Sequence, residues 1–184
     1  MPSKMPIEIT EAGVDDASPV ARLHSLSWQA SYAGILPDDY LKNQATNERA
    51  SYWSRALPSR DYALVLLARD QAGPVAFIAI KEQVDPGYDA TIEHLHVLPQ
   101  MKGRGLGRLL MTEAASRLIA NGHRSVCLWV FEDNKPAIGF YEKLGGVTDA
   151  HGTDKFLGGD AADRRIGWHD LSALRSACEE VVKS

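Results

Sequence analysis

The chain has 184 residues, of which 45% are hydrophobic and 24% are charged, and its formal net charge is −4. This length and composition are typical of one globular unit with a hydrophobic core, and the small negative charge gives no reason to expect a nucleic-acid partner. No apolar run approaches the ~18 residues that a membrane-spanning helix requires, and the first residues show no secretory pattern. We therefore expect a cytoplasmic protein without a membrane partner.

The N-terminal third predicts one strand and two helices. Apolar and polar residues alternate over 7–10, which predicts a short strand. Capping residues and a proline at 15–19 predict the start of a helix. Its expected buried face consists of Val20, Leu23, Leu26 and Trp28. The stretch 28–37 should end this helix, and a second helix is expected from Pro37 to about Pro58.

The next segments predict strands of a sheet that is covered on both faces. Residues 62–69 and 75–82 are almost continuously apolar, and residues 70–74 between them have the composition of a hairpin turn. Residues 124–131 form another such run, in which Cys127 is expected to be buried and unreactive. Strands that are buried on both faces lose the alternation of apolar and polar residues, which explains these uniform patterns.

The most informative pattern lies in residues 89–122. Apolar and β-branched residues over 91–98 predict a strand that ends at Pro99, because proline has no N–H to donate to a neighbouring strand. Three glycines follow at alternate positions: Gly103, Gly105 and Gly107. Leucines at helical spacing then predict a helix that stops at Gly122.

A strand, a glycine turn and a helix in this order can bind an anion such as a diphosphate. The first N–H groups of a helix lack partners within the helix, and the helix dipole adds positive charge there. Glycines remove the Cβ atoms that would keep a phosphate away. Positive side chains near the turn are Lys102, Arg104 and Arg108. The spacing fits neither a Walker loop, which ends in Gly-Lys-Ser/Thr, nor a dinucleotide fingerprint, whose third glycine position holds Arg108.

The C-terminal quarter predicts a capped helix, a loop, a strand and a final helix. Asn134 can cap a helix over 137–144, which the glycines at 145–146 end. Residues 151–160 are polar and contain three glycines, so a mobile loop is expected there, before a last strand at 163–169. The final helix has an apolar stripe made of Leu171, Leu174, Cys178 and Val181. This stripe is expected to dock on the rest of the chain, with a homodimer contact as the alternative.

Two motifs resemble the GNAT superfamily of acetyl-CoA-dependent N-acetyltransferases. The first is Gln-Met-Lys-Gly-Arg-Gly at 100–105, which follows the strand end Leu-His-Val-Leu-Pro at 95–99. The second motif comprises Asn134, Ala137, Phe140, Tyr141, Lys143, Leu144 and Gly145. The resemblance spans about residues 7–170, and residues 171–184 would add the C-terminal helix. It implies an α/β fold with a mixed, mostly antiparallel sheet of about seven strands, flanked by helices, in which a bulged central strand splays from its neighbour.

The resemblance also implies acetyl-CoA as the co-substrate, and no metal. The diphosphate would lie at the glycine turn, and the pantetheine arm would enter the gap between residues 95–97 and 127–130. A backbone N–H near Leu95 or His96 would face the acetyl oxygen. The implied cofactor-binding residues are Leu95, His96, Val97, Gln100, Met101, Lys102, Gly103, Arg104, Gly105, Leu106, Gly107, Arg108, Asn134, Ala137, Phe140 and Tyr141. Asn134 could fill this role and cap its helix at once, because the two roles use different atoms.

Two catalytic residues are expected on the same basis. Tyr141 would give a proton to the departing thiolate, because a phenol with a pKa of ~10 lies close to a thiol of ~8.5; the alternative is a tyrosine that only packs on the core. Glu93 would relay a proton from the attacking ammonium, and strand alternation places it on the side of Leu95 unless a bulge shifts the phase. His94 and His96 are rivals for this role because histidine titrates near neutrality. Many relatives have tyrosine at the position of His96, so this site departs from the common pattern.

The expected function is transfer of an acetyl group from acetyl-CoA to a primary amine of a small molecule or peptide, by direct attack and without a covalent enzyme intermediate. The alternative is a regulatory or interaction module that binds CoA without turnover. Trp28 and Tyr32 are candidates for the substrate wall, with core packing as the alternative. The acceptor should be selected by residues 28–40 and 150–162, and protein N-termini, polyamines, amino acids and antibiotics all remain open.

Overall fold

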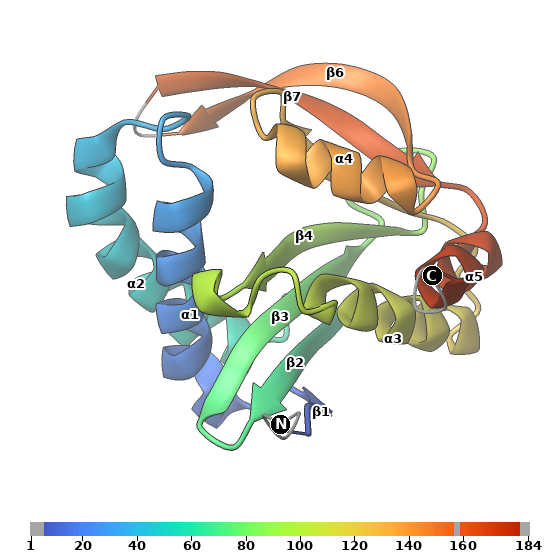
Figure 1. Cartoon of the computed structure of the whole chain (residues 1–184), viewed down its shortest axis with the longest axis horizontal. Coiled ribbons are helices and arrows are strands. Elements are labelled where there is room, and N and C mark those ends of the chain that lie inside the picture. The colour runs from blue at the N-terminus through green and yellow to red at the C-terminus, as the bar shows by residue number, and fades with distance from the viewer. Residues whose placement is uncertain (1–5, 157–158, 181–184) are drawn as a thin grey trace.

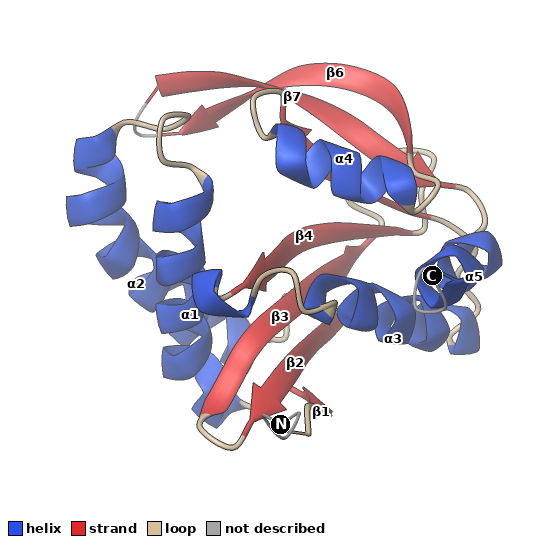
Figure 2. Cartoon of the chain, viewed as in Figure 1, coloured by secondary structure: helices blue, strands red, loops and turns tan. Residues whose placement is uncertain are grey.

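The protein folds around one seven-stranded sheet, described here by a computed structural model that covers residues 6–156 and 159–180. The strands are β1 (Glu8–Glu11), β2 (Leu64–Asp70), β3 (Gly73–Glu82), β4 (Ala90–Val97), β5 (Val126–Phe131), β6 (Val147–Phe156) and β7 (Gly159–Trp168). The helices are α1 (Ala17–Ser31), α2 (Ala45–Ser59), α3 (Leu106–Ala120), α4 (Lys135–Lys143) and α5 (Leu171–Glu180). Their arrangement can be followed in Figure 1 and, by element type, in Figure 2.

The sheet has the order β1-β2-β3-β4-β5-β7-β6, and every neighbouring pair is antiparallel except β4 with β5. Shorter turns complete the fold: 3₁₀ turns at Val14–Asp16 and Pro99–Met101, and a π-helical turn at Tyr40–Gln44 that leads into α2. The expected α/β fold with a mostly antiparallel sheet of seven strands is confirmed.

The apolar strands β2 and β3 divide their side chains between two helical layers. Leu66 and Ile78 belong to the core that α3 and α5 cover, whereas Leu67 and Phe77 belong to the core that α1 and α2 cover. In Figure 1, α1 and α2 lie to the left of the central strands and α3 crosses in front of them. Because successive residues of a strand point to opposite faces, strands between two such layers need apolar residues at nearly every position.

The central strands β4 and β5 separate partway along their length. They pair only at Ala90–Ile92 of β4 with Val126–Leu128 of β5. On its other edge, β4 has a bulge opposite Ala79 and Ile80 of β3, where the register shifts by one residue at Glu93. A bulge bends a strand and increases its twist, and the end of the β4–β5 pairing at the same place opens the expected splay.

The segment expected to be a mobile loop is instead part of a hairpin. Residues 151–156 belong to β6 and pair with β7, with partners such as His151 with Arg164 and Asp154 with Ala161. The expectation was wrong because it relied on polar composition. An antiparallel partner supplies the backbone hydrogen bonds of a strand whatever its side chains, and an edge strand such as β6 can carry polar residues on both faces.

A smaller correction concerns α1. Leu26 was expected on the buried face, but it is 41% exposed, while His24 and Ser27 are buried. Three of the six buried residues of α1 are polar, and the six are Val20, Ala21, Leu23, His24, Ser25 and Ser27. Buried polar side chains need hydrogen-bond partners, and His24 and Ser27 find theirs outside α1, at Trp53 and His96.

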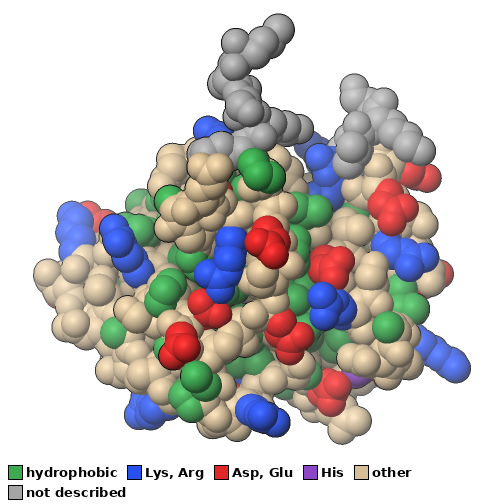
Figure 3. Space-filling view, turned by 90° about the horizontal axis from the view of Figure 1, so that it is seen from below, with side chains coloured by type: hydrophobic (Ala, Val, Ile, Leu, Met, Phe, Trp, Pro, Cys, Tyr) green, Lys and Arg blue, Asp and Glu red, His purple; other side chains and the backbone are tan. Residues whose placement is uncertain are grey.

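The C-terminal helix α5 packs on α3. Leu171, Leu174 and Cys178 join the main core, and Val181 lies outside the described residues. The boundary at residue 170 and a dimer contact stay predictions. No helix in the described part of the chain is both long and apolar enough to cross a membrane. On the face seen in Figure 3, acidic and basic side chains are interspersed, without a continuous basic patch.

Candidate active site

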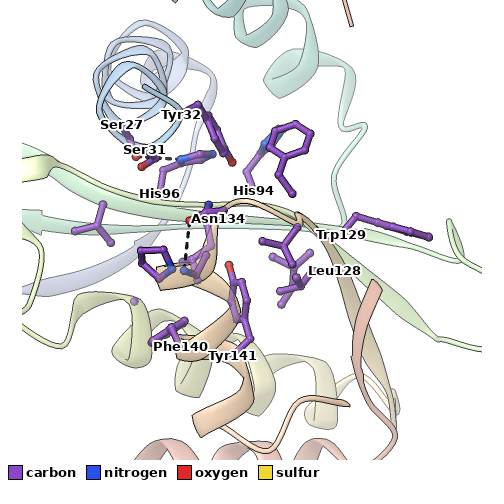
Figure 4. A pocket seen from close by; sticks show the side chains of 18 of the residues that line it. Ser27, Ser31, Tyr32, His94, His96, Leu128, Trp129, Asn134, Phe140 and Tyr141 are labelled. Carbon is purple, nitrogen blue, oxygen red and sulfur yellow. Dashed lines mark hydrogen bonds between the residues drawn. The ribbon is translucent and has the colours of Figure 1, made fainter. Parts of the chain in front are cut away.

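A cleft of about 1300 Å³ opens where β4 and β5 separate. In Figure 4, side chains from α1 lie on one side of the strands, and Asn134, Phe140 and Tyr141 lie on the other. Most residues predicted for the site line this cleft. They are Trp28, Tyr32, Glu93, Leu95, His96, Val97, Met101, Lys102, Gly103, Gly105, Leu106, Gly107, Arg108, Asn134, Ala137, Phe140 and Tyr141. Gln100 and Arg104 are exposed residues outside this lining.

The glycine turn presents free backbone donors at one end of the cleft. Gly103 and Gly105 have φ values of +75° and +79°, a left-handed conformation that glycine adopts without strain. Gly105 is the N-cap of α3, and the first α-helical hydrogen bond at this end runs from Leu109 N to Gly105 O at 2.9 Å. Among the hydrogen bonds of the described residues, none uses the N–H groups of 103–108. These donors fit the diphosphate of a nucleotide cofactor.

The third glycine has a packing role. A Cβ atom at Gly107 would lie 3.3 Å from the ring of Phe140, so glycine lets the N-terminal end of α3 approach α4 closely. Asn134 caps α4, because its side-chain oxygen accepts a hydrogen bond from the Ala137 N–H at 3.4 Å. This leaves the amide nitrogen of Asn134 as a donor toward the cleft that Asn134 lines.

Tyr141 reaches the cleft from α4. Its side chain is 8% exposed, and Figure 4 shows its hydroxyl directed away from α4 toward the gap beside Leu128. Burial, with a smaller contribution from Tyr32, raises the pKa of Tyr141 above its ordinary value. The hydroxyl is therefore protonated throughout the neutral range and can act as a hydrogen-bond or proton donor.

Glu93 lies at the bulge of β4. Ile92 and Leu95 face the same core although they are three residues apart, so the bulge shifts the phase of the strand. Alternation therefore does not force Glu93 onto the side of Leu95. Glu93 is exposed at the cleft, yet the surrounding protein desolvates its carboxyl and raises its pKa, against a lowering by Lys81. A carboxylate with a raised pKa is a stronger base.

Three histidines meet beside the cleft, and one of them was not expected there. His24 of α1 lies between His94 and His96 of β4, with ring centroids 4.6 and 4.5 Å away. The Trp53 indole N–H donates to His24 Nδ1 at 2.9 Å, and Ser27 Oγ lies 3.0 Å from His96 Nδ1. Burial lowers the pKa of all three rings, to about 3 for His96. The charge of His96 further lowers the pKa of His24 and His94, and Arg49 further lowers the pKa of all three rings. All three are neutral at pH 7.

This cluster is a candidate metal site by proximity, because the nitrogens of the three rings lie within 4.8 Å of one another. The hydrogen bond from Trp53 argues against this role. It fixes the lone pair of neutral His24 on Nδ1 and the proton on Nε2, and Nε2 is buried without a partner among the described residues. A metal at Nε2 would need the opposite tautomer. The Trp53 hydrogen bond therefore disfavours a metal at His24, and the expected absence of a metal stays a prediction.

The other end of the cleft is aromatic and charged. Trp28 and Tyr32 line it, with ring centroids 5.2 Å apart, and Tyr32 packs edge-on against Phe131 of β5 at 5.2 Å. This end also includes Tyr40, Thr153 and Asp154, which lie in the segments 28–40 and 150–162 expected to select the acceptor, and Trp129, which lies in the segment expected beside the pantetheine gap. The lining residues of this end that the sequence did not suggest are Arg49 and Asp163. The polar members of the buried face of α1 were a signal for His24. No local pattern indicated Arg49 or Asp163, because their neighbours at the cleft come from distant segments.

Known acetyltransferases resemble this chain in sequence. A profile described as "Acetyltransferase (GNAT) family" matches residues 20–146. The chain is 30% identical over 174 residues to a Bacillus subtilis protein described as the uncharacterized N-acetyltransferase YuaI, with 92% of this chain and 97% of YuaI covered. It is 24% identical over 164 residues to the spermidine N(1)-acetyltransferase of Thermoplasma acidophilum, covering 82% and 94% of the two chains.

A solved structure supports the same fold. The crystal structure of the PaiA N-acetyltransferase from Thermoplasma acidophilum in complex with coenzyme A matches with a TM-score of 0.65 at 21% identity. The match covers 87% of this chain and 98% of that one.

Proposed function

Because this chain belongs to the acetyltransferase (GNAT) family, we propose that it moves an acetyl group from acetyl-CoA to a primary amine of a small molecule or peptide, by direct attack of the amine. The observation that carries this proposal is the set of unpaired N–H groups at 103–108 at the mouth of the β4–β5 splay, with Tyr141 beside the same gap. The spermidine acetyltransferase among the relatives supports a small amine as the acceptor.

The residues of the cleft fit the co-substrate. The N–H groups of 103–108 would bind the diphosphate, assisted by the positive ends of Lys102 and Arg108, which line the cleft. The Asn134 amide would donate to the pantetheine arm between β4 and β5. When bound, acetyl-CoA supplies an activated thioester carbonyl, and a backbone N–H near Leu95 or His96 would donate to its oxygen.

Tyr141 is the proposed acid for the departing thiolate. Its raised pKa makes the phenol a weaker acid than a free tyrosine, which by itself would slow proton transfer. Burial disfavours any anion in this gap, however, so a thiolate released beside Tyr141 would also bind a proton more strongly than in water. Proton transfer depends on the difference between the pKa of Tyr141 and the pKa of the CoA thiol. Because burial raises both, this difference changes less than either pKa alone.

Glu93 is the proposed base, acting on the ammonium form of the acceptor through water. Its carboxyl reaches the cleft, and its raised pKa supports a proton-accepting role. His94 and His96 are the rivals, because both line the cleft as neutral rings. Their strongly lowered pKa values weaken them as bases, since a ring that resists protonation accepts a proton reluctantly.

A thiol-release assay tests the proposal. Acetyl-CoA is mixed with the protein and a panel of primary amines, and free CoA thiol is followed with time. Release that depends on both the protein and an amine, together with mass-spectrometric detection of the acetylated amine, supports the proposal. Saturable CoA binding without thiol release for any amine would favour the non-catalytic module instead.

A further inference from the structure

The β6–β7 hairpin places a buried carboxylate at the acceptor end of the cleft. Asp163 of β7 is 9% exposed, lines the cleft, and has an Oδ1 atom without a hydrogen-bond partner among the described residues. Leaving a buried polar group unpaired is costly, and a buried charge without a partner is more costly still. The proposed mechanism gives Asp163 no role, so its position needs another explanation.

The strand register fixes the face that Asp163 occupies. Asp163 pairs with Phe131 on one side and with Gly152 on the other, and directly paired residues of antiparallel strands point to the same face. Phe131 contacts Tyr32, so this is the face that α1 covers. Asp154 follows Gly152 by two residues on β6 and therefore shares that face.

A second carboxylate faces the same space. Asp154 lines the cleft, and its charge contributes to the raised pKa values of Tyr32 and Tyr40. Burial and the nearby Asp154 raise the pKa of Asp163, against a lowering by a hydrogen bond from its own backbone N–H, and Glu132 adds a smaller rise. Negative charge thus accumulates at this end of the cleft.

No cation of the described residues neutralises this pair. None of the ion pairs between described side chains includes Asp154 or Asp163. Glu132, the acidic neighbour, is already paired with Arg164. Arg49 also lines the cleft, but its guanidinium lies over the ring of Trp28, 4.6 Å from the centroid. Arg165, two residues along β7 from Asp163, lies over one side of the Trp129 ring and is already paired with Asp85 and Asp149.

The rest of this end suits an organic cation. Gly152 lacks a Cβ atom, which would otherwise lie 2.8 Å from Asp163 Oδ1 and 3.0 Å from the ring of Trp129. The carboxylate therefore lies close to an aromatic ring, and Tyr32 lines the cleft on the α1 side. Carboxylates surrounded by aromatic rings stabilise an ammonium group through charge and cation–π attraction.

We infer that Asp163 and Asp154 form a subsite for a second positive charge of the acceptor, so that the preferred acceptor is an amine carrying another ammonium group away from the one that is acetylated. This inference rests on the proposed function and adds the substrate class. The bound ammonium supplies the counter-charge that Asp163 lacks. Glu93, the proposed base, acts on the amine that is acetylated.

The test compares α,ω-diamines of increasing length with monoamines in which a methyl group replaces the second ammonium. Wild-type protein should show a diamine preference in kcat/KM of roughly 10- to 100-fold, the range expected for a desolvated charge pair. Asp163→Asn should abolish most of this preference, and Asp154→Asn should reduce it. Asp160→Asn, an exposed position of the same hairpin outside the cleft lining, is the matched control and should keep the preference.

Two further measurements separate this inference from the proposed function. Calorimetry of diamine binding to the CoA-saturated protein needs no turnover, and Asp163→Asn should lose the tighter binding of the diamine. Asp163→Asn should also raise the Tm of the free protein, because it removes an unpaired buried charge, whereas a purely structural carboxylate would lower the Tm when replaced.

The outcomes are distinct. Turnover of monoamines with no preference for diamines would overturn the subsite and leave the acetyl transfer standing. Diamine binding that depends on Asp163, without acetylation of any amine, would support the subsite and overturn the proposed function. A diamine preference that Asp163→Asn leaves unchanged would also overturn the subsite.

Discussion

Acidification should destabilise this fold strongly, because His24, His94 and His96 are held as neutral rings. His24 is 0% exposed and His96 is 7% exposed, and burial lowers the pKa of all three. In the unfolded chain each ring would titrate near its ordinary pKa of ~6.5. The unfolded state therefore binds more protons than the folded state over the window from about 6.5 down to the folded values, about 3 for His96.

The sign and size of the effect follow from proton linkage. When a histidine has a lower pKa in the folded chain than in the unfolded chain, its contribution to stability is fully present above the unfolded-state pKa. This contribution is lost as the pH falls toward the folded-state pKa. Between about pH 7.5 and about pH 5, each ring that stays neutral in the folded state lowers the free energy of unfolding by up to about 2 kcal/mol. Three rings together cost up to about 6 kcal/mol, which is comparable with the whole stability of a typical domain, about 5–15 kcal/mol.

Urea unfolding at a series of pH values measures this loss. His94→Gln is the best perturbation, because no hydrogen bond of His94 is found among the described residues. This substitution should reduce the pH-dependent fall in the free energy of unfolding by about a third, to about 4 kcal/mol. A wild-type loss below about 1 kcal/mol, or an equal loss in wild type and His94→Gln, would refute the reasoning.

Three predictions concern the chemistry. Tyr141→Phe should lower single-turnover rates by more than about tenfold with CoA affinity nearly unchanged by calorimetry; an unchanged rate would remove Tyr141 from the mechanism. Gly105→Val should weaken CoA binding by about tenfold or more, because a β-branched residue resists the φ of +79°. The control Gly87→Val strains a turn outside the cleft lining and should leave CoA binding unchanged. Glu93→Gln should lower kcat/KM by at least about tenfold and His94→Gln by less than about threefold; the reverse order would make the histidine the base.

The sequence determined the parts of this protein whose conformation depends on neighbouring residues. Gly103 and Gly105 at a strand-to-helix turn indicated free N–H groups at the start of α3, and the structure has them. The uniformly apolar runs 62–69 and 75–82 indicated strands covered on both faces, which the two helical layers explain. In each case the physical requirement lies within a few residues of the chain, so a local pattern can report it.

Only the tertiary structure decided what depends on partners distant in the chain. β6 is a strand because β7 completes its backbone hydrogen bonds, although its polar composition suggested a loop. His24 joins His94 only when α1 packs on β4, and its tautomer depends on Trp53 from α2. Asp163 became a candidate for binding a cation because the register of the hairpin turns it toward the cleft, where no described cation pairs with it. Burial and pairing of a charged group are properties of the packed fold, and residue identity along the chain does not contain them.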